Sequence, residues 1–180
     1  MRINYLMCLI GLYLCSYSCS CQKSGMQKSG SNEVSMDTTI IIPEKIEPLQ
    51  LTDEEWRKKL SSECYYVMRE KGTERSFTGK LWDNHQTGIY LCNACQLPLF
   101  SSATKFESGT GWPSFFKPLR NDLVSEIVDD TYGMIRKEIV CSRCKGHLGH
   151  VFDDGPAPTG LRYCMNSVSL KFIPSGSVPK

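Results

Sequence analysis

The sequence predicts a mainly β domain of antiparallel strands with a short helical cap at its N-terminal end. Three observations support this prediction. A helical period of apolar residues occurs between Thr52 and Gly72 and disappears beyond Phe77. Short runs rich in β-branched and aromatic residues then alternate with clusters of Gly, Pro, Asp and Ser. The chain has 180 residues, 41% of them hydrophobic, which suffices for one sizeable core and leaves little room for a second.

The first predicted helix begins at Thr52. Thr52 and Glu55 have the spacing of a capping box, in which each side chain binds the other residue's backbone N–H. Trp56 and Leu60 then lie one turn apart on the same helical face. This face is expected to pack on the domain.

A second short helix is predicted to follow directly. Ser61 or Ser62 can cap its N-terminus, and Gly72 suits the left-handed position that often follows a helix. Its apolar residues are Cys64, Tyr65, Val67 and Met68. Beyond it, β-rich runs are expected at residues 88–92, 132–141 and 161–172.

The N-terminal residues 1–21 resemble an export signal. Arg2 precedes an apolar run too short to span a bilayer, and small residues follow it. Cleavage would give a secreted or periplasmic protein, acylation of Cys19 or Cys21 would give a membrane-tethered lipoprotein, and a retained segment would act as a weak anchor. All three alternatives place the body outside the cytosol.

The remaining organisation follows from composition. Residues 22–48 repeat Gln-Lys-Ser-Gly and are rich in polar residues and Pro, so we expect a flexible linker. A single folded domain that carries the chemistry is expected at residues 49–174, and a disordered tail is expected at 175–180. The formal net charge of +2 provides no field that favours nucleic acid as a partner and points to protein or small-molecule chemistry.

The ten cysteines fall into groups. Four precede residue 22, Cys64 and Cys164 stand alone, and the others form two Cys-x-x-Cys pairs, Cys92/Cys95 and Cys141/Cys144. Two such pairs can supply four thiolates to one tetrahedral ion, so we expect a structural zinc with no open position. Two disulfides, or a redox-active pair as in thioredoxin-like proteins, are the alternatives, although neither pair has the βαβ setting of the latter.

Cys164 lies in an alternating stretch that predicts a strand. Arg162, Cys164 and Asn166 would project from one face, and the neighbouring arginine would favour the nucleophilic thiolate. A cysteine that packs as a small apolar side chain is the alternative.

Two further motifs could serve such a thiol. His147 and His150 follow the second cysteine pair directly and are able to carry protons near neutral pH, although they could equally be metal ligands or surface residues. The turn at residues 109–115 carries Trp112, whose indole suits contact with a thioether methyl.

These residues resemble a known family. The strings LTDEEW, REKGTERSFTGKLWDNHQTGIYLCNACQLPLF, GTGWPSF and CSRCKGHLGHVFDDGPAPTGLRYCMNSVSLKF are similar to the B-type peptide-methionine (R)-S-oxide reductases over residues 51–173. The resemblance implies two antiparallel sheets, zinc on the two cysteine pairs, no organic cofactor, oxidised proteins as substrates and a thioredoxin-like or other thiol as reductant.

The resemblance also implies residue roles. Cys164 would attack the sulfoxide sulfur and become a sulfenic acid, Trp112 would hold the methyl group, and the remaining pocket residues would orient or protonate the oxygen: His147, His150, Arg162 and Asn166. Many relatives carry a resolving cysteine where this chain has Thr110. Cys64 is therefore the one internal alternative to direct reduction by an external thiol, which we favour.

Two other functions fit part of the pattern. A non-catalytic zinc-stapled binding module would tolerate loss of Cys164. A general thiol-disulfide oxidoreductase would reduce insulin and show little preference between sulfoxide epimers, but it leaves Trp112 and the metal pairs unexplained.

Overall fold

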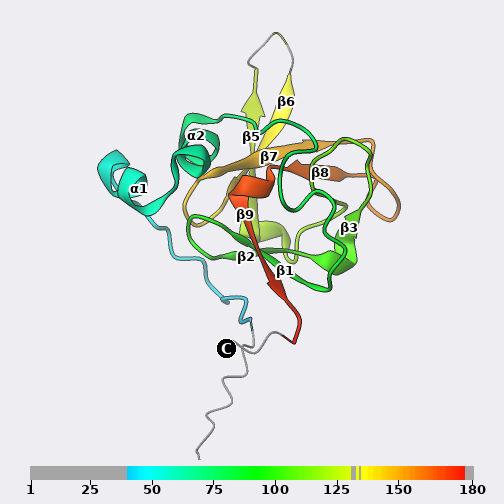
Figure 1. The fold of residues 1–180 in the computed structure, drawn as a ribbon. Coiled ribbons are helices and arrows are strands. Elements are labelled where there is room, and N and C mark those ends of the chain that lie inside the picture. Colours follow the sequence, from blue (N-terminus) through cyan, green and yellow to red (C-terminus); the bar gives the residue numbers. More distant parts are fainter. Residues whose placement is uncertain (1–39, 131–132, 134, 177–180) are drawn as a thin grey trace, which may run out of the picture. The chain divides into compact units, whose positions relative to one another are not determined.

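The computed structural model describes residues 40–130, 133 and 135–176 (Figure 1). Two helices, α1 (Asp53–Lys59) and α2 (Ser62–Glu70), precede the strands. The strands are β1 (Gly88–Cys92), β2 (Pro98–Ser101), β3 (Lys105–Phe106), β4 (Ser114–Phe115), β5 (Val124–Asp129), β6 (Arg136–Cys141), β7 (His147–Phe152), β8 (Arg162–Met165) and β9 (Leu170–Pro174). Short 3₁₀ turns lie at η1 (Ser102–Thr104), η2 (Asn121–Leu123) and η4 (Ser167–Ser169).

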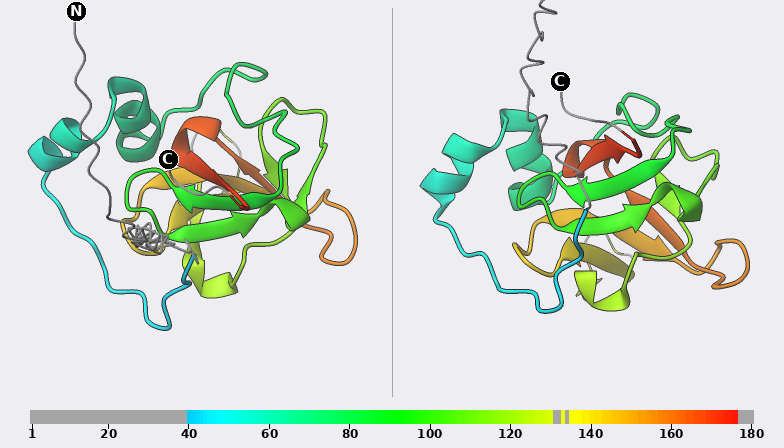
Figure 2. Two further views of the ribbon diagram at one scale, coloured as in Figure 1. Left: turned by 60° about the horizontal axis from the view of Figure 1, so that its bottom comes forward. Right: turned by 90° about the horizontal axis from the view of Figure 1, so that it is seen from below.

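The strands form two antiparallel sheets, so the predicted fold class is confirmed. One has the order β2-β1-β9 and the other the order β3-β4-β8-β7-β6-β5. Figure 2 shows the green and red strands of the smaller sheet against the yellow and orange strands of the larger one, with both helices to one side. Opposed sheets of this kind bury their facing side chains in a shared core.

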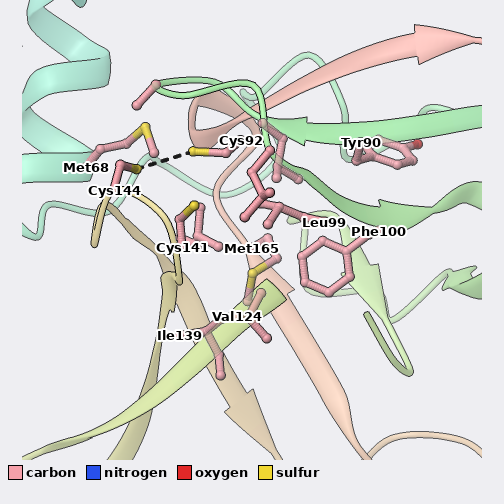
Figure 3. Packing of buried hydrophobic residues seen from close by; sticks show 14 of the residues in the cluster. Met68, Tyr90, Cys92, Leu99, Phe100, Val124, Ile139, Cys141, Cys144 and Met165 are labelled. Carbon is pink, nitrogen blue, oxygen red and sulfur yellow. Dashed lines mark hydrogen bonds between the residues drawn. The ribbon is translucent and has the colours of Figure 1, made fainter. Parts of the chain in front are cut away.

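That core draws on both sheets. Tyr90 and Phe100 come from the smaller sheet and Ile139 and Met165 from the larger one, and all are 0% exposed (Figure 3). Burying side chains of this size contributes about 1.5–3 kcal/mol each. Because Met165 points into the core, Cys164 beside it points to the opposite face of the sheet.

The helical cap forms as predicted. The Glu55 carboxylate accepts from Thr52 N at 2.8 Å, and Thr52 Oγ1 accepts from Glu55 N at 3.3 Å, which completes the capping box. Ser61 caps α2 through Cys64 N at 3.2 Å. Trp56 is 1% exposed, so the predicted inner face of α1 is buried.

The left-handed residue after α2 is Lys71, with φ of 58°, and not Gly72 as predicted. Glycine at position 72 instead lies close to an aromatic ring. A Cβ there would lie 2.2 Å from the Tyr66 ring, which is 52% exposed and would have to move aside.

Two predicted strands have other limits. Within 132–141, regular pairing begins at Arg136, and positions 131, 132 and 134 lie outside the described residues. The run 161–172 is not one strand: β8 belongs to the larger sheet and β9 to the smaller one. The chain turns between them because the Glu74 carboxylate accepts from Ser167 N at 2.6 Å and from Val168 N at 3.0 Å.

The packed body begins earlier than residue 49. Ile42 and Ile46 pack against the core, and Pro43 O accepts from Arg120 Nη2 at 3.0 Å. Because these isoleucines are partly buried against the core, residues 42–46 belong to the packed body and not to the expected flexible linker. The predicted export signal at residues 1–21 and most of the predicted linker lie outside the described residues, as do residues 177–180 of the predicted tail. Within the described chain, none of the helices has the length and apolar character to cross a bilayer.

Candidate active site and metal centre

A single cross-strand row carries the reactive groups of the larger sheet. Cys164 on β8 pairs with Ser114 on β4 and with His150 on β7, and His150 pairs with Glu138 on β6. Directly paired residues project from the same face of a sheet with their Cβ atoms about 4.5–5.5 Å apart. The register therefore places the thiol, an imidazole and a carboxylate side by side.

Cys164 lines a pocket of about 140 Å³. Trp112, His150, Phe152 and Asn166 are among the residues that line it. Its aromatic and thiol lining suits one small side-chain group with an apolar part and a reactive centre. The predicted Cys164, Trp112, His150 and Asn166 are thus brought together.

The Trp112 indole is held in place. Its Nε1 donates to Glu74 O at 3.1 Å, so its one polar atom is used by the protein and the ring is left to make apolar contacts. Asn166 is tied down in a similar way, since Oδ1 accepts from Glu74 N at 3.0 Å and Nδ2 donates to Leu148 O at 3.1 Å. Both side chains connect the pocket to the loop that carries Glu74.

Burial raises the pKa of the Cys164 thiol. A hydrogen bond with Thr110, whose Oγ1 is 3.9 Å from Cys164 Sγ, and the Arg162 charge act in the opposite direction but do not outweigh it. Arg162 thus favours the thiolate, as the sequence predicted, but burial is the larger effect and the pKa of the thiol is raised overall. The Arg162 guanidinium also binds other groups: it donates two hydrogen bonds of 2.8 Å to Asp154 and stacks 4.4 Å above the Phe152 ring centre.

The two histidines occupy different positions. His150 lines the Cys164 pocket, and its Nε2 is 2.8 Å from Asp129 Oδ2. His147 does not line that pocket and lies behind it, with its ring centre 5.4 Å from that of His150. Its Nδ1 is 2.8 Å from the Glu138 carboxylate. Both residues line a second cavity of about 550 Å³.

Sequence reasoning missed the carboxylates behind these rings. Glu138 is 2% exposed and Asp129 forms a 2.6 Å ion pair with Arg136. The sequence signal was weak, because Glu138 follows Arg136 and Lys137 and Asp129 precedes Asp130, and charged residues grouped in this way usually face solvent. Only the strand register shows that they face imidazoles.

The four predicted metal ligands converge. The sulfurs of Cys92, Cys95, Cys141 and Cys144 all lie within 4.8 Å of one another. The sulfurs of Cys92 and Cys144 are 3.6 Å apart, and those of Cys95 and Cys141 are 3.5 Å apart. Figure 3 marks the contact between Cys92 and Cys144 with a dashed line. Tetrahedral zinc with Zn–S distances of about 2.3 Å requires sulfurs about 3.8 Å apart. The donor set fits such an ion, and all four positions would be filled by protein.

The described cysteines are free thiols, so the disulfide alternative does not match this geometry. Hydrogen bonds among the four thiols lower the pKa of Cys144 and Cys95 and raise that of Cys92 and Cys141, because the neighbouring thiols share their protons. The cluster joins the turn after β1 to the turn after β6, and so pins the two sheets together.

Cys64 lies against the metal turn. Asn93 Nδ2 donates to its sulfur at 3.5 Å, and its thiol contacts Met68 Sδ at 3.5 Å. It is 2% exposed, and burial raises the pKa of its thiol. Neither contact involves a residue that lines the Cys164 pocket.

A thiol in a small aromatic pocket, backed by histidine–carboxylate pairs and held on a β domain whose four clustered cysteines could bind one metal ion, defines a thiol-dependent enzyme. Comparison with known proteins gives its family. Residues 60–174 match the family model described as SelR domain.

Relatives are found in distant organisms. The chain is 61% identical over 123 residues to a protein of Thiobacillus denitrificans, covering 68% of this chain and 93% of the relative. It is 58% identical over 121 residues to one of Leptospira interrogans, covering 67% and 92%. It is 59% identical over 124 residues to one of Methanosarcina barkeri, covering 69% and 87%. All three are named peptide methionine sulfoxide reductase MsrB. This chain belongs to the methionine sulfoxide reductase B family, as its motifs indicated.

Proposed function

We propose that this enzyme reduces the R epimer of methionine sulfoxide in oxidised proteins and that Cys164 is the nucleophile. The observation that carries the proposal is the small pocket in which the Cys164 thiol, the Trp112 ring and the His150 imidazole meet. The sulfoxide methyl would pack on Trp112 while its sulfur faces Cys164. A pocket with these groups on fixed sides accepts one configuration at sulfur better than its mirror image.

The chemistry is balanced with one thiol. The Cys164 sulfur attacks the sulfoxide sulfur and forms an S–S bond, and the sulfoxide oxygen is protonated. The oxygen then moves to Cys164 as the S–O bond to methionine and the new S–S bond break. Methionine leaves and Cys164 becomes a sulfenic acid, so the sulfoxide is reduced and the cysteine oxidised by two electrons. His150 and His147 would hold and move the proton.

We propose that an external thiol, such as a thioredoxin-like protein, then reduces the sulfenic acid. Two such thiols form one disulfide, release water and regenerate Cys164. Thr110, the residue in contact with Cys164, has a hydroxyl that cannot take this role. Cys64 is placed against Asn93 and Met68, which supports the external route over an internal one.

Zinc bound by the four cysteines would be structural. It would supply folding energy and hold the turn that leads into β7, which carries both histidines. The step that forms methionine can be assigned to the chain's own residues, and only the return of Cys164 to its thiol needs the external reductant.

Export remains a proposal that rests on residues 1–21 alone. An exported reductase would repair proteins in an oxidising compartment, where methionine damage occurs outside the cytosol. Mass spectrometry of the mature N-terminus would test it: an intact Met1 on cytosolic protein contradicts export, whereas a lipid on Cys19 or Cys21 establishes the membrane tether.

The central test uses separated R and S epimers of a peptide-bound methionine sulfoxide, with dithiothreitol as reductant. We expect methionine from the R epimer only, and none from Cys164→Ser, whose fold and metal content should be unchanged. Reduction of both epimers at similar rates together with insulin reduction would instead identify a general thiol-disulfide oxidoreductase. Retention of more than a small fraction of activity by Cys164→Ser would exclude the mechanism.

A further inference from the structure

The carboxylate of Glu138 lies between His147 and Lys71. Oε1 of Glu138 is 2.8 Å from His147 Nδ1, and Lys71 Nζ donates to Oε2 at 2.8 Å. The His147 and Glu138 side chains are each 3% exposed, whereas Lys71 is 66% exposed. A charged group of this kind is stable in the interior only when its oxygens are paired, and here both are used.

This contact fixes the tautomer of His147. Burial raises the pKa of Glu138, but the hydrogen bonds from Lys71 and His147 outweigh it, so the net pKa lies below the ordinary value and the carboxylate is ionised. An ionised carboxylate only accepts hydrogen bonds, so Nδ1 of His147 must carry the hydrogen. Nε2 is then the ring atom that gains or loses a proton.

Nε2 of His147 is buried and has no hydrogen-bond partner among the described residues. Leaving a polar atom bare in the interior costs free energy that a protein normally avoids. A transient partner is therefore to be expected at this atom. Both imidazoles line the larger cavity, and His150, Arg136 and Thr73 line that cavity and the Cys164 pocket alike.

Lys71 adds an independent observation. It adopts the left-handed backbone conformation, with φ of 58°, which a residue with a side chain adopts only at a cost in energy. Glycine would be the usual residue there. In this position the lysine ammonium reaches Glu138, which connects the end of α2 to strand β6.

We propose that Glu138 and Lys71 are positioning residues of the reaction. Glu138 holds His147 in the Nδ1–H tautomer and stabilises its protonated form, whereas the positive charge of Lys71 destabilises that form. Together they set how readily His147 supplies the proton that the sulfoxide oxygen takes up. The inference rests on the proposed function, in which the histidine pair protonates that oxygen.

Several titratable or charged groups line the cavity that His147 also lines. They are Tyr66 and Glu70 of α2, Lys71 after it, Asp129 of β5, Arg136 and Glu138 of β6, and His150 of β7. Burial lowers the pKa of His147; the hydrogen bond with Glu138 raises it, and the charges of His150 and Lys71 lower it. Loss of the Glu138 charge should therefore lower this pKa further, and loss of the Lys71 charge should raise it.

The sign of the pH dependence follows. A histidine that donates a proton is active below its pKa, so activity is lost as pH rises through that value. In Glu138→Gln the alkaline limb of kcat should move to lower pH by about one unit, since a paired carboxylate shifts a neighbour by about 1–3 units. In Lys71→Met it should move to higher pH by about 0.3 unit, because the exposed lysine is screened by water.

The experiment titrates the histidines of the full chain by imidazole NMR and records kcat against pH for the same variants. The chain has 3 histidines, so each imidazole signal can be assigned with a variant that lacks that histidine. Lys137→Met is the matched control, because Lys137 is 57% exposed on β6, pairs with Glu126 and projects from the other face. It should shift neither the titration of His147 nor the kcat profile.

Opposite shifts in Glu138→Gln and Lys71→Met, seen in both readouts, would support the proposal. Shifts in the same direction, or none, would overturn it. If Glu138→Gln fails to fold, Lys71→Met decides alone, since its side chain is on the surface. Activity retained in Cys164→Ser would refute the proposed function itself, whereas an inactive Cys164→Ser beside unshifted profiles would refute only this inference.

Discussion

Replacing Thr110 by cysteine should give the Cys164 sulfenic acid an internal partner. Thr110 Oγ1 lies 3.9 Å from Cys164 Sγ. A disulfide needs sulfurs about 2.05 Å apart, so the introduced sulfur must approach by about 1.9 Å, which a side-chain rotation and a small turn movement can supply. The nearby Ser108 and Ser114 hydroxyls hydrogen-bond to each other at 2.7 Å and need not move.

The expected acceleration follows from proximity. A thiol held at contact distance acts at an effective concentration of about 1 M or more, so compared with an external thiol at about 1 mM it should consume the sulfenic acid about 1,000-fold faster. Turnover would then depend on how fast a reductant reopens the disulfide.

The assay gives the enzyme one equivalent of peptide substrate without reductant, quenches with dimedone and maps the products by mass spectrometry. The unchanged enzyme should carry dimedone on Cys164 with Cys64 free, and T110C should carry a disulfide between the introduced thiol and Cys164. Thr110→Ser, which keeps a hydroxyl, should behave like the unchanged enzyme. Equal dimedone labelling in T110C, with the introduced thiol free, would refute the placement of position 110 beside the nucleophile.

Three further predictions follow from the structure. Cys92→Ser should lose its metal and melt at lower temperature, because ligand loss removes folding energy; metal analysis and thermal unfolding test this, and full metal content with unchanged melting contradicts it. Gly149→Ala should lose activity and about 1–3 kcal/mol of stability, because a Cβ would lie 2.0 Å from Cys164 O; urea unfolding that matches the unchanged enzyme contradicts the close approach. Arg162→Gln should raise the pKa of Cys164 further, since the arginine charge lowers it; iodoacetamide alkylation at pH 8 should slow, and a faster rate would reverse the assigned sign.

Local chemistry explains what the sequence could predict. The capping box depends on two residues three positions apart, Thr52 and Glu55. The two cysteine pairs likewise have the spacing of metal ligands in the sequence itself. Alternation in β8 correctly placed Cys164 and Met165 on opposite faces. These signals need no knowledge of the rest of the fold.

Contacts between distant segments explain what the sequence could not predict. The break after β8 depends on Glu74, which binds backbone groups 93 and 94 positions further along. The pairing of His147 with Glu138 depends on the register of a hairpin that contains a bulge between Ile139 and Val140. The net shift in the pKa of the Cys164 thiol likewise depends on how much water the folded pocket excludes, and the spacing of residues in the sequence does not reveal this.

The raised pKa of Cys164 is consistent with the stoichiometry of the reaction. A thiol and a sulfoxide give a sulfenic acid and a thioether without net uptake or release of a proton. The hydrogen that ends on the sulfenic oxygen can therefore be the one that the buried thiol holds before substrate arrives. A permanently ionised cysteine would have lost that proton to solvent and would need another from outside the pocket. A protonated histidine can give its proton to oxygen and then take up the proton that leaves sulfur, so the histidine pair ends the step as it began. His150 lies beside this thiol and His147 lies behind it, and the charges that adjust the proton affinity of His147, on Glu138 and Lys71, lie outside the Cys164 pocket.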